Sequence, residues 1–208
     1  MTYDDALLLQ KNTAKKVSAD KDEFGEISRI CGVDVAYSGS DGSSSSDTAY
    51  ASAVIMDRNM QHIVESVDVQ TPVKYPYIPG LLMLREAEPI LCALRMLKNT
   101  YDLLLIDGHG VLHPRRCGLA CYIGVTLNRP TIGVAKSLLC GTVRSDRFIE
   151  FDSEILGYAM SKKLYISIGH RITLKTAIAL LKEIGVEPLR LADMNSRKNR
   201  EKNPFGLD

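Results

Sequence analysis

The stretch LLLIDGHGVLHPRR, residues 103–116, runs from four apolar residues through an acid into a turn rich in glycine, histidine and arginine. The run DLLLID, which begins at Asp102, is too apolar for a strand with one face in solvent. We therefore predict a central strand that is covered on both faces and ends at Asp107. The turn that follows carries two histidines and two arginines, which indicates a cleft at the end of this strand rather than more core.

Segments on both sides of this strand predict the rest of the fold. Upstream, β-rich runs with short loops are typical of an antiparallel meander over residues 27–39, 48–57 and 62–71. Apolar spacing predicts helices over residues 80–97, 118–127 and 173–185, and further strands over residues 131–136, 147–151, 155–161 and 164–169. Pro89 should kink the first of these helices or begin a second helical segment, and Gly185 should cap the last. The result is one α/β domain, residues 1–208, with a mixed sheet and helices on both faces.

The ends of the chain and its composition limit the class of protein. The first ~25 residues are predicted to form a charged helix packed on the outside, without a signal-peptide pattern. The net charge of +1 means that any anion-binding surface must be local. No apolar run approaches the roughly 18 residues of a membrane span. The five cysteines include no C-x-x-C pair, which predicts free thiols in a reducing compartment. We therefore expect a soluble, cytoplasmic, monomeric protein without membrane contact.

Three acids occupy apolar surroundings: Asp34 in the first strand, Glu86 on the long helix, and Asp107 at the end of the central strand. An unpaired carboxylate in such a place costs several kcal/mol. The ordinary explanation is an ion pair with a nearby arginine, such as Arg85 or Arg115. The functional alternative is that the acids converge on Mg²⁺ or Mn²⁺, which prefer carboxylate oxygens. Asp34 and Asp107 would be neighbours if their two strands pair in parallel, and a helix packed across them could add Glu86.

The turn after Asp107 supports the functional alternative. Its glycines allow backbone to approach a ligand closely, and His113 with Arg115 and Arg116 supplies donors suited to phosphate oxygens. Another apolar strand ends in Lys136, which is either a solvated strand end or a further group at the same edge of the sheet.

Long stretches of the sequence resemble the signature blocks of endonuclease V, a deoxyinosine-specific repair nuclease. The close matches are PYIPGLLMLRE (residues 76–86), LLLIDGHGVLHPRRCGLA (103–120) and PTIGVAKSLLCG (130–141). Two further blocks, GVDVAYS and SIGHRITLKTA, are similar more loosely. The resemblance implies an RNase H-like fold. It also implies Mg²⁺-dependent hydrolysis, with Mn²⁺ as a substitute, of the second phosphodiester bond 3′ to a deaminated, flipped-out adenine, which leaves a nick.

The resemblance also implies roles for individual residues. The metal-binding and catalytic acids fall on Asp34, Glu86 and Asp107, and two further catalytic groups fall on Lys136 and His170. A wedge that separates the strands falls on the motif PYIP, which comprises Pro76, Tyr77, Ile78 and Pro79. Recognition of the base falls on residues around the glycine-rich turn and the helix start, namely Gly80, Leu82, Gly108, Gly110, His113 and Leu139. Contacts to the nucleic-acid backbone are expected from Arg115 and Arg116.

Several alternatives stay open at this point. Tyr77 could simply pack on the core beside a rigid turn, and His170 could be a histidine at a helix N-terminus. The partner is double- or single-stranded DNA containing deoxyinosine, or RNA containing inosine. A non-catalytic protein that binds inosine or branched DNA, or a structure-selective nuclease, would be the other classes. The serine-rich loop, residues 39–47, is a spacer or a substrate contact. The basic tail is a solvated helix end or a phosphate contact; it carries Arg197, Lys198, Arg200 and Lys202.

Overall fold

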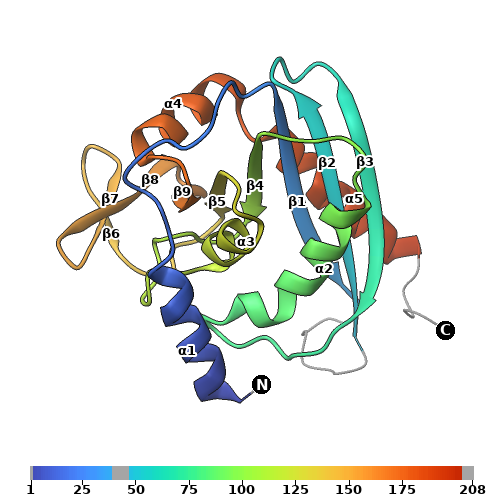
Figure 1. The fold of residues 1–208 in the computed structure, drawn as a ribbon, viewed down its shortest axis with the longest axis horizontal. Coiled ribbons are helices and arrows are strands. Elements are labelled where there is room, and N and C mark those ends of the chain that lie inside the picture. Colours follow the sequence, from blue (N-terminus) through green and yellow to red (C-terminus); the bar gives the residue numbers. More distant parts are fainter. Residues whose placement is uncertain (1, 39–46, 203–208) are drawn as a thin grey trace.

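The structure is a computed structural model that describes residues 2–38 and 47–202 (Figure 1). The helices are α1 (Tyr3–Ala14), α2 (Leu82–Met96), α3 (Leu119–Leu127), α4 (Leu174–Ile184) and α5 (Glu187–Lys202). The strands are β1 (Arg29–Tyr37), β2 (Thr48–Asp57), β3 (Ile63–Pro72), β4 (Leu103–Asp107), β5 (Thr131–Ala135), β6 (Thr142–Val143), β7 (Phe148–Phe151), β8 (Glu154–Ser161) and β9 (Leu164–His170). Most of the predicted serine-rich loop lies outside the described residues.

The strands of the described chain form one mixed sheet, in the order β3-β2-β1-β4-β5-β9-β8-β7-β6. Strands β1, β2 and β3 pair antiparallel, which confirms the predicted meander. Strand β4 pairs in parallel with β1 on one side and with β5 on the other. The carboxyl ends of β1, β4 and β5 therefore meet at one edge of the sheet, which is where the predicted acids were expected.

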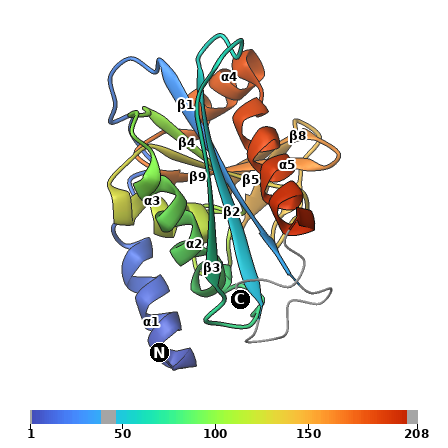
Figure 2. The ribbon, with the colours of Figure 1, turned by 90° about the vertical axis from the view of Figure 1, so that its right-hand side faces the viewer.

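Helices cover both faces of the sheet, with α1, α2 and α3 on one face and α4 and α5 on the other (Figures 1 and 2). The pleat of β1 separates the two cores, because successive side chains of a strand point to opposite faces. Cys31 and Val33 pack with α2 and α3, whereas Ile30 packs with α4. The apolar residues of β4 alternate in the same way and are fully buried, as predicted for a strand covered on both faces.

Helix α5 lies directly on the backbone of β1, and the sequence did not predict it as a separate helix. A Cβ atom added to Gly32 would lie 2.2 Å from the backbone nitrogen of Leu189. Only glycine allows two backbones to approach so closely. Pro188 stands in the first turn of α5, where a missing backbone N–H costs nothing. Gly32 thus fixes where α5 crosses the sheet.

The N-terminal helix is shorter than predicted, and it packs on the outside of the domain through one face, as expected. It ends at Ala14 instead of near residue 25, and Ala6 and Gln10 on its inner face are buried. Beyond it, the backbone N–H of Ser18 donates to Nδ1 of His170 across 3.1 Å. This tertiary contact holds the following segment against the far end of β9, so the helix cannot continue.

Two predictions about the other helices have different outcomes. Helix α2 runs through Pro89 as one helix, so the prediction of a second helical segment was wrong. The ring of Pro89 is buried, and packing of this face outweighs the loss of one backbone donor. The prediction for α4 is confirmed, because Gly185 ends the helix at φ 69° and its N–H donates to the carbonyl of Leu181.

The five cysteines are free thiols, as predicted. Within the part of the chain that the structure describes, none of the helices has both the length and the apolar character needed to cross a bilayer.

Candidate functional site

A cavity of about 670 Å³ opens where β1, β4 and β5 end, between α2 and α5. Its lining combines residues from the whole length of the chain, so no single segment makes the site. The structure brings ten of the predicted site residues to this cavity: Asp34, Tyr77, Gly80, Leu82, Glu86, Asp107, Gly108, His113, Lys136 and Leu139.

Three carboxylates form the centre of the site. One oxygen each from Asp34, Asp107 and Asp193 lies within 4.8 Å of the others; we call these residues the acid cluster. The parallel register pairs Val33 with Ile106, so Asp34 and Asp107 come next on adjacent strands and stand side by side. Glu86 lines the same cavity from α2, on the other side of the sheet.

Asp193 was missed by the sequence analysis, which treated its surroundings as a basic tail. Helix α5 meets β1 at Gly32 and Leu189, and Asp193 lies one helical turn further on the same face. The hydroxyl of Ser196 then donates to Oδ2 of Asp34 across 3.2 Å and to the backbone carbonyl of Asp193 across 3.0 Å. A signal existed in the helical spacing of Leu189, Ala192 and Ser196, the buried face of this helix.

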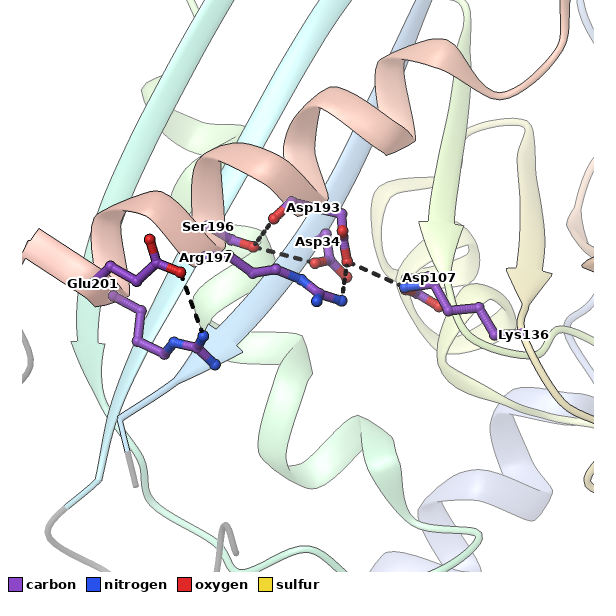
Figure 3. Close-up of polar contacts among 8 residues, drawn as sticks. Asp34, Asp107, Lys136, Asp193, Ser196, Arg197 and Glu201 are labelled. Atoms are coloured by element: carbon purple, nitrogen blue, oxygen red, sulfur yellow. Dashed lines mark hydrogen bonds and ion pairs between the residues drawn. The ribbon is translucent and has the colours of Figure 1, made fainter. Parts of the chain in front are cut away.

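Two basic side chains reach the acid cluster (Figure 3). Nζ of Lys136 lies 2.7 Å from Oδ2 of Asp107 and 3.1 Å from Oδ1 of Asp193. A guanidinium nitrogen of Arg197 lies 2.8 Å from the same oxygen of Asp193. Lys136 remains largely exposed, so it can leave these contacts without disturbing the core.

The acids of the cavity are short of positive charge. Burial, reinforced by Asp107 and Asp193, raises the pKa of Asp34 to about 7. Burial together with Asp34 and Asp107 also raises the pKa of Glu86 well above its usual range. Burial acts in the same direction on Asp193, but Lys136 and Arg197 outweigh it and lower the pKa of that carboxyl group. Clustered oxygen donors whose negative charges repel one another match the ligand preference of Mg²⁺ or Mn²⁺, so the residues present fit such a cation.

The two arginines considered as partners for the acids have other contacts. Arg85 forms an ion pair with Asp47 at 3.3 Å and stacks over the ring of Tyr37 at 4.0 Å. Arg115 donates through Nη2 to the carbonyl oxygen of Gly80 across 2.7 Å. The ordinary explanation for the acids, ion pairing with an arginine, therefore does not hold for Arg115, whereas the charge of Arg85 acts to lower the pKa of Glu86, against the larger effect of burial.

His113 lines the cavity and is almost fully buried. Its Nδ1 accepts a hydrogen bond from the backbone N–H of Arg115 at 3.1 Å, so Nε2 carries the proton and donates to the carbonyl of Gly80, also at 3.1 Å. Burial first, and then the neighbouring charge of Arg115, lower the pKa of His113 to about 4. His113 is thus a neutral donor at pH 7 that supports the turn.

Some predicted residues lie elsewhere. His170 pairs with Thr131 at the start of β5, whereas Lys136 follows the other end of that strand. Because β9 runs antiparallel to β5, the histidine is carried away from the acids. Gly110 also lies outside the cavity lining: its N–H donates to Oγ of Ser167 at 2.8 Å, and an added Cβ would meet the carbonyl oxygen of Ile168. Gly110 is required for packing of the turn and has no free N–H for a base.

The predicted contacts to the nucleic-acid backbone are also engaged within the protein. Arg115 points inward, as described above. Arg116 pairs with Glu154 at 3.0 Å and lies over the ring of Phe151 at 5.0 Å. Both guanidinium groups therefore have partners within the protein, and the Arg116 side chain stays partly exposed.

The motif PYIP projects from the molecule. The side chain of Tyr77 is 56% exposed, and Pro76 and Pro79 on either side of it are exposed as well. Ile78 is partly buried against the core of α2. Tyr77 does not pack on the core, which was the ordinary alternative for this motif.

Comparisons with known proteins agree with these features. The sequence model of the family described as Endonuclease V matches residues 11–194. Endonuclease V of Thermofilum pendens is 40% identical over 201 residues, 88% of this chain and 84% of that protein. The crystal structure of Endonuclease V from Streptomyces avermitilis has a TM-score of 0.86 at 30% identity, over 97% of this chain and 94% of that one. Endonuclease V of Ciona intestinalis, in complex with a 24mer DNA containing an inosine followed by a ribo-adenosine, has a TM-score of 0.79 at 26% identity, over 93% and 95%. The predicted RNase H-like fold is thereby confirmed.

Proposed function

The chain belongs to the endonuclease V family, and from that premise we propose that it is a metal-dependent nuclease that nicks DNA at deoxyinosine. The bond cleaved is the second phosphodiester 3′ to the deaminated base. The observation that carries the proposal is the acid cluster of Asp34, Asp107 and Asp193 at the floor of a cavity wide enough for a nucleotide. The Ciona relative bound to inosine-containing DNA supports the choice of substrate.

The acid cluster would hold Mg²⁺, or Mn²⁺ in its place, through one carboxylate oxygen from each residue. When bound, the cation supplies activation of water and stabilisation of the leaving oxygen. Ser196 keeps the Asp34 carboxylate oriented by its hydrogen bond. Glu86 binds at the edge of this set or orients a water, because it lines the same cavity from α2.

Lys136 supplies positive charge that can move. Its ammonium group is held by Asp107 and Asp193 but remains exposed. In the proposed reaction it turns toward the scissile phosphate and stabilises the negative charge that develops there. His170 has no part in this proposal, because it lies at the opposite end of β5.

Tyr77 and the cavity have separate roles in recognition: the ring opens the base stack, and the cavity receives the flipped base. An aromatic ring held between two prolines is suited to enter the stack and fill the space of a flipped base. The flipped hypoxanthine would then enter beside Leu82, Gly108 and Leu139, which line the cavity. Hypoxanthine offers O6 as an acceptor and N1–H as a donor. The N–H groups of Gly108, Gly110 and Val111 already donate to Val134, Ser167 and Ile168, so the donor for O6 would be another group of the cavity lining.

Contacts to the phosphate backbone move from the predicted arginines to α5. Arg197 and Arg200 line the cavity beside Asp193 and are about half exposed. Guanidinium groups suit phosphate oxygens, so the basic tail serves as a phosphate contact in this proposal. The serine-rich loop stays without a role.

RNA containing inosine is a second candidate substrate. The specific observation in its favour is that the DNA bound by the Ciona relative carries a ribonucleotide after the inosine. A 2′-hydroxyl next to the base is thus compatible with binding in that relative, and we propose that this chain accepts it as well.

The test is cleavage of an end-labelled duplex with one deoxyinosine, with Mg²⁺ and with EDTA, beside the same duplex with inosine in a ribonucleotide. Asp107→Asn removes a cluster carboxylate, and Asp20→Asn is the matched control because Asp20 is exposed in the segment between α1 and β1 and does not line the cavity. The proposal expects a Mg²⁺-dependent nick that is absent only in the Asp107 variant. Retention of the labelled strand without any nick would favour a binding protein and refute the nuclease.

A further inference from the structure

One backbone carbonyl below the cavity accepts an unusual number of hydrogen bonds. The oxygen of Gly80 receives Nη2 of Arg115 at 2.7 Å, Nε2 of Gln10 at 3.1 Å and Nε2 of His113 at 3.1 Å. A carbonyl oxygen has two lone pairs, so three donors fix its position from several directions. We call these three side chains, with the carbonyl that they share, the Gly80 network.

Gln10 ties this network to the N-terminal helix. It is 1% exposed on α1, and its amide nitrogen also donates to the carbonyl of Cys117, while its Oε1 accepts from Nε of Arg115. Turning the amide over would set its oxygen against two carbonyls and its NH₂ against a guanidinium group. Only one orientation satisfies every partner, so Gln10 holds the carbonyls of Gly80 and Cys117 at a fixed separation.

These contacts lie at the base of the exposed motif. Gly80 follows Pro79, the last residue of PYIP, and precedes the start of α2 (Figure 1). It has φ 77°, and an added Cβ would lie 2.9 Å from Nη2 of Arg115. Tyr77 itself is exposed. More than half of its side chain lies in solvent, so the direction in which the ring projects depends on the backbone, which is anchored at Gly80 and by Ile78.

We propose that Gln10 and Arg115 are positioning residues that hold the base of the wedge against the turn beside the base pocket. This inference rests on the proposed function, because it concerns how the chain opens a duplex. Pushing a ring between stacked bases is unfavourable, and the stack exerts an equal force back on the wedge. Without the Gly80 network the backbone of the PYIP motif shifts under this force, whereas the acid cluster and the cavity floor stay in place. Arg115 thus contributes to DNA recognition from inside the protein, without touching a phosphate.

The test compares two substrates that differ only in whether the strands are already apart. One is a fully paired duplex with a single deoxyinosine, and the other places the same deoxyinosine in an unpaired bubble. Gln10→Leu and Arg115→Lys are the test variants, Tyr77→Ala removes the wedge itself, and Lys11→Ala is the control on the exposed face of α1. Melting temperatures are measured for each variant.

For the paired duplex, each test variant should lower kcat/KM about tenfold, the usual scale for loss of a buried hydrogen bond to a charged group. For the bubble, the change should stay within about twofold, as for Lys11→Ala on both substrates. Adding Gln10→Leu to Tyr77→Ala should have little further effect on the paired duplex, because the wedge is already absent.

The possible outcomes distinguish a failure of this inference from a failure of the proposed function. Equal losses on duplex and bubble would assign Gln10 and Arg115 to general stability and overturn the inference. If Tyr77→Ala cleaves both substrates like the unmodified protein, the wedge itself is wrong and the inference falls with it. If the unmodified protein cleaves neither substrate, the proposed function is wrong.

Discussion

The acid cluster and the Gly80 network are both groups of buried or partly buried polar side chains at one cavity, but their electrostatics are opposite. In the cluster, like charges crowd together and burial raises the pKa of Asp34 to about 7. In the network, donors and acceptors match, and burial lowers the pKa of His113 to about 4, so that it stays neutral. The charged Asp34 carboxylate is unfavourable for the folded protein until a cation or a proton joins it, whereas Lys136 pairs with Asp107 and Asp193. The network is complete without any ligand.

This difference predicts which substitutions should abolish activity without lowering stability, and which should lower stability. Residues that repel one another in the folded state are kept for what they bind, and neutralising one should relieve the fold. Residues that satisfy one another hold a shape, and removing one leaves buried partners unpaired. Each experiment below tests one side of this comparison.

The largest effect is expected in the cluster. Asp34→Asn should lower cleavage at least about 1,000-fold, or ~4 kcal/mol in the activation barrier. The same change should raise the unfolding free energy at neutral pH by ~1 kcal/mol, because it removes a repelled charge and keeps an acceptor for Ser196. Nicking assays and thermal melting measure the two quantities. A variant that is both inactive and clearly less stable would contradict the assignment of Asp34 to function rather than to stability.

The Gly80 network should make the stability of the protein depend on pH in the acid range. The folded pKa of His113, about 4, lies below its ordinary value, so the unfolded chain binds more protons between about pH 4 and pH 6.5. Stability is therefore lost as pH falls through this window, by up to ~3 kcal/mol. Chemical unfolding at several pH values measures this loss. His113→Gln, which keeps a donor for the Gly80 carbonyl, should show a smaller loss; an unchanged acid slope would contradict the assignment to His113.

Binding of Mn²⁺ should stabilise the cluster with the opposite dependence on pH. The pKa of Asp34 is raised to about 7, so the folded protein binds more protons than the unfolded chain from about pH 4 to pH 7, and its cation-free stability falls as pH rises. A cation replaces that proton, so its effect should grow over the same window and reach ~2.7 kcal/mol at about 100 times Kd. Melting with Mn²⁺ and with EDTA at about pH 6 and about pH 8 measures it. Equal stabilisation of Asp34→Asn would show binding elsewhere.

Gly32→Ala should affect both the stability of the fold and the binding of Mn²⁺, because it changes the position of α5. Its Cβ would lie 2.2 Å from the Leu189 nitrogen, so α5 must shift, at a cost of ~2 kcal/mol in stability. Asp193 would shift with the helix and weaken the stabilisation by Mn²⁺. Gly25→Ala is the matched control, since an added Cβ there meets nothing within 4 Å. Calorimetry with and without the cation compares them, and an unchanged response to Mn²⁺ would mean that Asp193 contributes little.

Local pattern determined much of the fold and part of the site. The apolar run before Asp107 specifies a strand buried on both faces, since no half-exposed strand would carry it. β-rich runs upstream specify the meander, and the glycine-rich turn indicates a cleft at the strand end. Asp34 and Asp107 could be brought together in thought because parallel pairing of their strands aligns them. Each of these inferences depends on residues near one another in sequence, where periodicity and turn chemistry act directly.

The features of the site that could not be predicted from the sequence depend on contacts between residues that lie far apart in the chain. Ser196 meets Asp34 across 162 positions, and Gln10 meets Arg115 across 105. Asp193 joins the acids only because Gly32 lets α5 lie on β1, and His170 leaves them only because β9 runs antiparallel to β5. Local propensity carries no information about which distant backbone will come within hydrogen-bond distance. The sequence thus determined the strands and the chemistry that they deliver, whereas packing of α1 and α5 decided which side chains complete the site and which ones hold it in shape.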